Sequence, residues 1–138
     1  MIPGVSSALA GPVLAGMPLT DTHLSKSYAV VSGHDLSQYD WAALKAVDTL
    51  VVMMGSRSLP QLIDVLREGG WPPDAKIAII HSASRDGQDE LYGDLQDIVG
   101  KTNGRDLSPS IIVVGGAVAL THPGHQSFRP QLQQMMPN

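Results

Sequence analysis

The sequence predicts an α/β fold, with a mainly parallel or mixed sheet and helices on both faces. The unbroken apolar run at 50–54 and the largely apolar runs at 76–80 and 110–114 have the length and character of strands buried on both sides. Segments with helical periodicity, clearest at 59–66, alternate with these runs, as in α/β proteins. Aromatic residues make up only 4% of 138 residues, so aliphatic side chains must fill the core. The alternation leaves the strand order open.

Two helices are expected in the first part of the chain. A run of small residues at 5–16 predicts a short helix that Gly16 ends and Pro12 can kink. Asp40 is placed to cap a second helix, whose apolar face would hold Leu44 and Val47.

The strongest helix signal follows residue 58. Ser58 can cap this helix, and Pro60 is tolerated in its first turn. Four apolar residues have the i, i+3, i+4, i+7 spacing of one buried helix face: Leu59, Leu62, Ile63 and Leu66. Gly69-Gly70 then ends the helix.

The remaining strands and helix are predicted by the same patterns. Beside the three apolar runs, strands are expected at 28–34, at 90–92 and, as an edge piece, at 118–120. Polar residues and a glycine make 82–89 a loop. The last predicted helix is capped by Asp94 and ends at Asn103-Gly104. Its buried face would hold Leu95, Ile98 and Val99.

Composition excludes several classes of function. With no cysteine, disulfides, thiolate metal sites and a cysteine nucleophile are ruled out. A net charge of −4 without a Lys/Arg run argues against nucleic acid, and no segment is apolar enough to span a membrane. We expect a cytoplasmic protein with one domain at 1–121 and a disordered tail at 122–138. The tail histidines, His122 and His125, lack further ligands nearby, so no metal site is expected.

Several separated motifs occur in an order that resembles the C-terminal domain of the uroporphyrinogen-III C-methyltransferases, in the tetrapyrrole methylase family. Residues 2–8 resemble the family's V-P-G-I-T-A/S-A, 15–20 its A-G-I-P-L-T, and 31–34 its V-T-G-H. Residues 84–88 resemble T-R-x-x-Q, and the Ser-Pro-Ser run at 108–115 completes the set. The similarity covers roughly residues 2–120. It implies two α/β domains with the cofactor between them, this chain being the second.

The resemblance implies S-adenosylmethionine as cofactor. Family residues that contact it map onto five positions here: Ser6, Ser7, Met54, Ala83 and Ile111. Three of them have a simpler alternative role: the two serines could be only a helix N-cap, and Met54, like Met53, could be only a strand core residue. For Met53 we expect the core role.

Three further positions are candidate contacts to a tetrapyrrole substrate. His34 follows the V-S-G motif and is assigned by resemblance only. Arg57 and Arg85 lie in loops where strands are expected to end, and arginine binds carboxylates, of which a porphyrinogen carries many. Both arginines could instead be ordinary solvated surface residues. No catalytic base is assigned.

The sequence also departs from the family pattern. The family's P-L-T-H-R is Pro18-Leu19-Thr20-Asp21-Thr22 here, which loses two basic residues. Its E-N-G-T is His81-Ser82-Ala83-Ser84, which adds a Cβ where glycine usually lets the backbone approach the cofactor.

The family's N-terminal half, with its G-x-G-P-G-D segment and its proposed acid–base residues, has no counterpart in this sequence. We therefore expect the missing N-terminal domain to be required for activity, and the exposed cofactor face to form a homodimer. Three alternatives remain open: a methylase of another corrinoid intermediate, a non-catalytic dimerisation or partner-binding module, and a free-standing flavodoxin-like ligand-binding domain.

Overall fold

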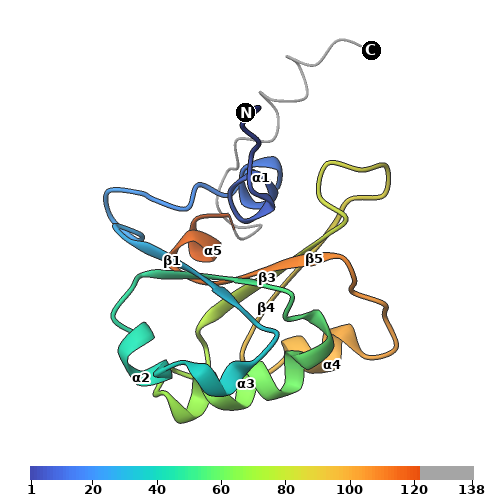
Figure 1. Ribbon diagram of the computed structural model, residues 1–138. Helices are drawn as coiled ribbons and strands as arrows, with labels where there is room; N and C mark the ends of the chain where they lie inside the picture. The colour runs from blue at the N-terminus through green and yellow to red at the C-terminus, as the bar shows by residue number, and fades with distance from the viewer. Residues whose placement is uncertain (122–138) are drawn as a thin grey trace.

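The computed structural model describes residues 1–121, which form a five-stranded sheet between two layers of helices (Figure 1). The strands are β1 (Tyr28–Ser32), β2 (Thr49–Met53), β3 (Lys76–His81), β4 (Asp89–Asp94) and β5 (Ser110–Gly115). The helices are α1 (Ser7–Leu14), α2 (Trp41–Leu44), α3 (Leu59–Glu68), α4 (Ile98–Thr102) and α5 (Gly116–Thr121), with single 3₁₀ turns at η1 (Leu36–Gln38) and η2 (Ser56–Ser58).

The sheet is mixed, with strand order β1-β2-β5-β3-β4. Only β1 and β2 pair in parallel, and the other three pairs are antiparallel. The mixed alternative of the sequence-based prediction is confirmed and the mainly parallel one is wrong. The reason is that β5 returns between β2 and β3 in the opposite direction. The carboxyl ends of β2 and β3 therefore meet the amino end of β5 at one edge of the sheet.

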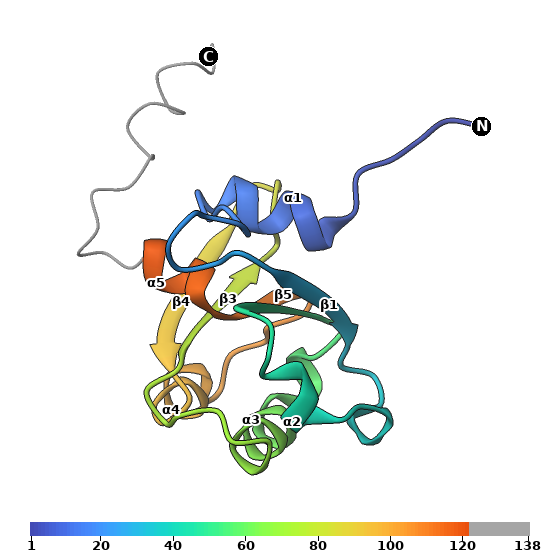
Figure 2. The ribbon, with the colours of Figure 1, turned by 90° about the vertical axis from the view of Figure 1, so that its left-hand side faces the viewer.

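The two helical layers follow from the alternation of side chains along the central strands. In β2, Leu50 and Val52 face the layer of α2, α3 and α4, whereas Val51 faces α1 and α5. Figure 2 shows α1 and α5 on one side of the sheet and α2, α3 and α4 on the other. Helices on both faces are as predicted.

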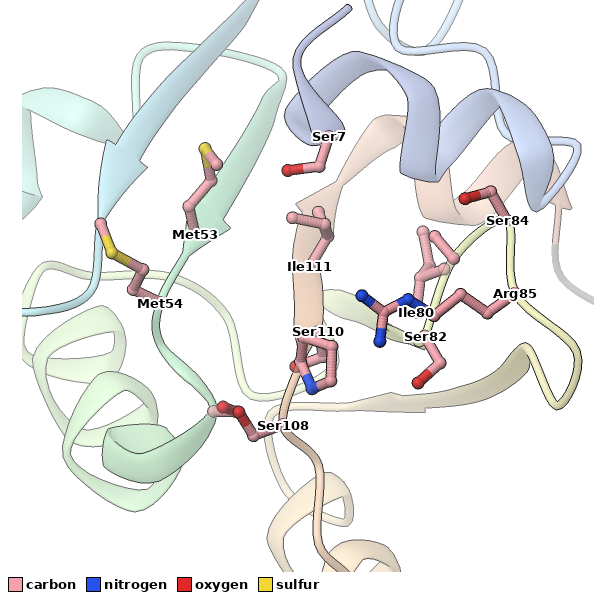
Figure 3. Close-up of a pocket in the computed structure, with 13 residues that line it drawn as sticks. Ser7, Met53, Met54, Ile80, Ser82, Ser84, Arg85, Ser108, Ser110 and Ile111 are labelled. Atoms are coloured by element: carbon pink, nitrogen blue, oxygen red, sulfur yellow. The ribbon is translucent and has the colours of Figure 1, made fainter.

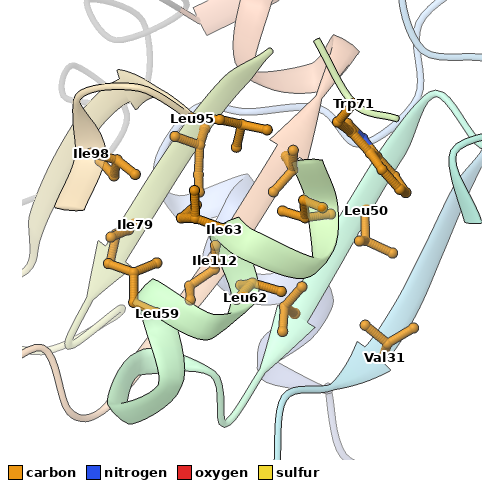
Figure 4. Packing of buried hydrophobic residues seen from close by; sticks show 14 of the residues in the cluster. Val31, Leu50, Leu59, Leu62, Ile63, Trp71, Ile79, Leu95, Ile98 and Ile112 are labelled. Carbon is orange, nitrogen blue, oxygen red and sulfur yellow. The ribbon is translucent and has the colours of Figure 1, made fainter. Parts of the chain in front are cut away.

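The α3 side holds the larger core (Figure 4). All four residues predicted for the buried face of α3 are at most 2% exposed, and they pack over Ile79 and Ile112 of the sheet. Gly70, with φ of +87°, ends the helix region in the left-handed conformation that glycine adopts readily. The prediction of this helix from its apolar spacing is confirmed.

Asp40 also acts as predicted, because its side chain accepts a hydrogen bond from the N–H of Ala43 at the start of α2. Ser58 precedes α3 but its side chain does not cap it. The Ser58 hydroxyl instead donates to the carbonyl of Gly33 at 3.0 Å.

Asp94 does not cap a helix directly. Its carboxylate accepts hydrogen bonds from the N–H groups of Gln96 and Asp97, so it closes a turn, and α4 begins only at Ile98. The short strand expected at 90–92 is present and is longer than expected, as β4 (Asp89–Asp94).

The edge strand expected at 118–120 is wrong, since these residues belong to α5. Gly115 has φ of +111°, which turns the chain out of β5. The N–H of Gly116 then donates to the carbonyl of Asp48, and the N–H of Ala117 donates to the buried hydroxyl of Thr49. These partners are distant in sequence, so local periodicity could not reveal the helix.

Two expectations concern the chain as a whole. The tail predicted at 122–138 lies outside the described residues. Within residues 1–121, no helix has the length and apolar character needed to cross a membrane.

Candidate functional site

A pocket of about 400 Å³ opens at the edge where β2 and β3 end and β5 begins (Figure 3). The register explains its position, because Ile111 of β5 is opposite both Met53 of β2 and Ile80 of β3. The pocket is lined by residues from four separate parts of the chain: Ser7, Met53, Met54, Ser56, Ile80, Ser82, Ala83, Ser84, Arg85, Ser108, Pro109, Ser110 and Ile111.

Backbone strain is concentrated in the pocket lining. Within residues 1–121, three residues other than glycine have positive φ: Met54 (56°), Ser82 (49°) and Ser84 (67°). All three line the pocket. Each such residue costs about 1–2 kcal/mol relative to an ordinary conformation, and such strain clusters at functional sites.

The turn at Met54 is held by a close contact between two glycines. The N–H of Gly33 donates to the carbonyl of Met53 at 2.7 Å, and Ser58 donates to the carbonyl of Gly33. A Cβ on Gly33 would lie 2.6 Å from the Cα of Gly55, so only glycine fits there. Met54 is 63% exposed at the rim of the pocket. It is therefore not a core residue.

The loop at 82–88 forms the opposite wall. The N–H of Ser82 donates to the carbonyl of Pro109 at 2.9 Å, and the N–H of Arg85 donates to the carbonyl of Ser82. Between the two strained serines, Ala83 has no positive φ and packs against the smaller core on the α1 side. The strain therefore lies at Ser82 and Ser84 and not at the position where the family has glycine.

Helix α1 forms the third wall. Ser6 is its N-cap, and its hydroxyl accepts a hydrogen bond from the N–H of Ala8 at 3.3 Å. Ser7, one residue further, lines the pocket. A Cβ on Gly11 would lie 3.2 Å from the Cγ1 of Ile111, so α1 lies close against β5.

The structure brings together five of the eight predicted site residues. Ser7, Met54, Ala83, Arg85 and Ile111 line the pocket, and Ser6 caps the adjacent helix end. His34 and Arg57 are both exposed and do not belong to the lining.

The surroundings of His34 do not favour an acidic ligand. Asp35 is its neighbour, and hydrogen bonds from Ser37 and Gln38 hold the pKa of the Asp35 carboxyl below its usual value. The carboxylate is thus charged at neutral pH and would repel other carboxylates nearby.

Sequence reasoning missed several lining residues. Met53 is half-buried and packs against the smaller core, as expected of a core residue, but it also lines the pocket. Five serines were also missed: Ser56, Ser82, Ser84, Ser108 and Ser110. The sequence did carry a signal for these serines, since most of them follow or precede a predicted strand. Only the antiparallel course of β5 brings them to the same edge of the sheet.

The lining is chemically simple. Apolar Met and Ile side chains alternate with serine hydroxyls, and Arg85 is the one ionisable residue in the lining (Figure 3). The Ser110 hydroxyl oxygen is shielded from solvent without a hydrogen-bond partner. No group of three metal-ligating side chains occurs within residues 1–121. The site therefore suits an organic ligand with an apolar part and several hydrogen-bonding groups.

Comparison with known proteins agrees with this description. The family model of the Tetrapyrrole (Corrin/Porphyrin) Methylases matches residues 1–99. The uroporphyrinogen-III C-methyltransferase of Synechococcus elongatus is 38% identical over 120 residues, covering 87% of this chain and 49% of that protein. The enzyme of the same name from Priestia megaterium is 36% identical over 124 residues, covering 86% of this chain and 52% of that protein.

Solved structures give the same result. The uroporphyrin-III C-methyltransferase of Thermus thermophilus superposes with a TM-score of 0.74 at 31% identity, covering 99% of this chain and 55% of that chain. A second structure, complexed with S-adenyl homocysteine, has a TM-score of 0.71 at 28% identity, covering 86% and 53%. The chain spans about half the length of these relatives. The fold, the motifs and these matches show that the chain belongs to the tetrapyrrole (corrin/porphyrin) methylases.

Proposed function

We propose that this chain is the C-terminal half of an S-adenosylmethionine-dependent methyltransferase that acts on uroporphyrinogen III. The observation that carries the proposal is the pocket: four of the five positions assigned to the cofactor by resemblance line it, although they come from four distant segments. A relative from Methanosarcina barkeri, 32% identical over 127 residues, is named an S-adenosyl-L-methionine-dependent uroporphyrinogen III methyltransferase.

The residues of the pocket fit such a cofactor. Met53, Met54 and Ile111 offer a soft apolar surface for a flat heterocycle. Serine hydroxyls, among them the unpartnered one of Ser110, can donate to or accept from ring nitrogens and sugar hydroxyls.

The cofactor would supply a methyl group to an electron-rich pyrrole carbon: the bond from the sulfonium sulfur to the methyl carbon would break, which leaves S-adenosylhomocysteine, and the substrate would release a proton. For this reaction the protein needs no nucleophile of its own, but it must hold both partners in line and exclude water. The walls formed by α1, the Met54 turn and the 82–88 loop would hold the donor. Arg85 is the residue of this pocket that could pair with a carboxylate of the substrate, while Arg57 and His34 would contact substrate only outside it.

We further propose that methyl transfer needs the part of the protein that corresponds to the other half of the relatives. The chain covers 49% of the relative from Synechococcus elongatus and 52% of that from Priestia megaterium. The family's proposed acid–base residues have no counterpart in these 138 residues.

The test is calorimetric titration of the 138-residue chain with S-adenosylhomocysteine, beside an assay of uroporphyrinogen III methylation. We expect measurable binding, no turnover by this chain alone, and turnover when the N-terminal half of a relative is supplied. Turnover by the purified chain alone would contradict the two-half proposal. If S-adenosylhomocysteine bound neither to the chain alone nor to the chain with the added N-terminal half, the assignment of the pocket would be contradicted.

A second candidate is a non-catalytic dimerisation module, favoured by the apolar residues that α1 exposes. The same titration separates the two, because such a module would associate without binding S-adenosylhomocysteine.

A further inference from the structure

The side chain of Gln88 joins three elements that meet beside the pocket. Its amide oxygen accepts a hydrogen bond from the N–H of Ser84 at 2.8 Å. Its amide nitrogen donates to the carbonyl of Leu14 at 3.4 Å and to the carboxylate of Glu90 at 2.8 Å. Gln88 does not line the pocket itself.

The first of these contacts acts on strained backbone. Ser84 has φ of +67°, which an L-residue leaves unless neighbouring contacts hold it. The Gln88 amide oxygen is the partner of its N–H. The Gln88 N–H in turn donates to the carbonyl of Arg85 at 3.0 Å, so the side chain closes the loop on itself.

The second contact acts on α1. Leu14 is the last residue of this helix, where carbonyl groups lack partners within the helix. The donor from Gln88 satisfies one of them over a separation of 74 residues. The opposite end of α1 carries Ser7 into the pocket.

The third contact fixes the amide itself. Glu90 lies in β4, which is part of the sheet, so its carboxylate sets the orientation of the Gln88 side chain relative to a rigid element. The amide oxygen can then accept from the loop while the amide nitrogen donates to the end of the helix.

From this geometry we infer that Gln88 is a positioning residue, which sets two walls of the pocket, α1 and the 82–88 loop, at the separation that the bound ligand requires. The inference rests on the proposed function for the identity of that ligand. Ser7 on α1 and Ala83 on the loop would lose their fixed relation when the amide is removed.

The test compares Gln88→Ala with Gln96→Ala in the 138-residue chain. Gln96 is exposed, and its side chain makes no contact with the pocket, so it is the matched control. We expect Gln88→Ala to weaken S-adenosylhomocysteine binding about 5- to 10-fold, as for the loss of one or two hydrogen bonds, and Gln96→Ala to leave it unchanged. The melting midpoint should change little in both. Unchanged affinity in Gln88→Ala would overturn the inference.

A rescue variant separates positioning from general loss of structure. Glycine adopts positive φ readily, so Ser84→Gly should recover part of the affinity lost in Gln88→Ala. A merely structural role of Gln88 predicts no recovery, because the substitution adds no contact.

Amide hydrogen exchange of the unliganded chain tests the same inference without a ligand. We expect Gln88→Ala to speed exchange at Ser84 and along α1 together. If the wild-type chain fails to bind S-adenosylhomocysteine, the proposed function fails, while faster exchange at both walls still supports the link made by Gln88. Unchanged exchange at either wall would overturn it.

Discussion

Gly33 and Gly55 touch at the ends of two neighbouring strands, so closely that a Cβ on Gly33 would lie 2.6 Å from the Cα of Gly55. The contact brings the end of β1 against the turn that carries Met54. The hydrogen bond from the Gly33 N–H to the Met53 carbonyl continues the parallel pairing one step beyond β1. The left-handed turn at Met54 therefore depends on a residue more than 20 positions earlier.

Replacing Gly33 by alanine should destabilise the protein and displace the Met54 turn. The obstructing atoms are backbone, which cannot move aside as a flexible side chain can. We expect a loss of about 1–3 kcal/mol, measured by urea unfolding, and weaker S-adenosylhomocysteine binding. The control is Gly100→Ala in α4, where nothing lies within 4 Å, so stability should stay the same or rise. Equal stability of both variants would mean that β1 and the turn can separate freely.

The Gly33 contact shows what the sequence could reveal and what it could not. The pattern at 31–34 predicted a strand ending in glycine, and the apolar spacing predicted α3, because both signals are local. The antiparallel course of β5 depends on its pairing with β2 and β3, and the helix after Gly115 is held by Asp48 and Thr49; all these partners are distant in sequence. The position of Ile111 between β2 and β3 could not be derived from periodicity.

Met54→Ala should weaken cofactor binding without much effect on stability. The side chain is 63% exposed in the free chain and would be covered only by a ligand or a partner. We expect a loss of about 1–3 kcal/mol in the free energy of S-adenosylhomocysteine binding, from lost apolar contact. Calorimetry would measure it.

The comparison for Met54 is Leu50→Ala in the same strand region. Leu50 is 1% exposed, so its removal leaves a cavity and should cost about 2–5 kcal/mol of stability. A large drop in the melting midpoint of Met54→Ala with unchanged affinity would contradict the role of Met54 as a pocket wall.

The strained serines predict a stabilising substitution. Asparagine adopts positive φ more readily than serine, so Ser82→Asn should relieve part of the strain at φ of 49°. We expect a gain of about 0.5–1 kcal/mol in thermal or urea unfolding. Ser56→Asn is the control, because Ser56 lines the same pocket without a positive φ. An equal gain in both variants would show that the effect comes from asparagine itself.

The candidate site was only partly predictable for the same reason as the fold. Resemblance singled out Ser7, Met54, Ala83 and Ile111, and all four line the pocket, while their contact with a cofactor stays a prediction. His34 was assigned to the substrate by resemblance only, and this stays a prediction; the structure gives it an exposed position beside a charged Asp35.

Acid should remove a stabilising ion pair in α4. The hydrogen bond from Lys101, with a bond from the N–H of Asp94, lowers the pKa of the Asp97 carboxyl. A lowered folded-state pKa gives stability that is present above the unfolded pKa, about 3.9, and is lost as pH falls through the folded value. Asp97→Asn should thus be less stable than wild type by about 0.3–0.5 kcal/mol near pH 6.

The two proteins should become equally stable at a pH low enough to protonate the carboxyl in the folded protein. Thermal melts at both pH values measure the difference. A stability gap that is independent of pH would show that the ion pair contributes nothing. Because Asp97 is exposed, high salt should also narrow the gap near pH 6.

The apolar surface on the α1 side predicts self-association. Within residues 1–121, the large hydrophobic residues with the greatest exposure come from the N-terminal segment and α1, from the 17–27 connection, from the outer face of β1 and from the Met54 turn: Met1, Ile2, Val5, Leu9, Val13, Leu14, Leu24, Tyr28, Val30 and Met54. None comes from the α2, α3 and α4 layer. In Figure 2 the two layers lie on opposite sides of the sheet. A one-sided apolar surface of this kind is typical of an interaction face.

We expect the 138-residue chain to form a symmetric dimer through this side, because a two-fold symmetric interface uses the same surface of both copies. Val13→Lys should shift the mass measured by light scattering towards the monomer, since Val13 is 59% exposed on α1 and a buried lysine would remain unpaired. Gln61→Lys adds the same charge on the exposed side of α3 and should leave the mass unchanged. A wild-type chain that stays monomeric at high concentration would contradict the prediction, and equal dissociation by both variants would place the interface elsewhere.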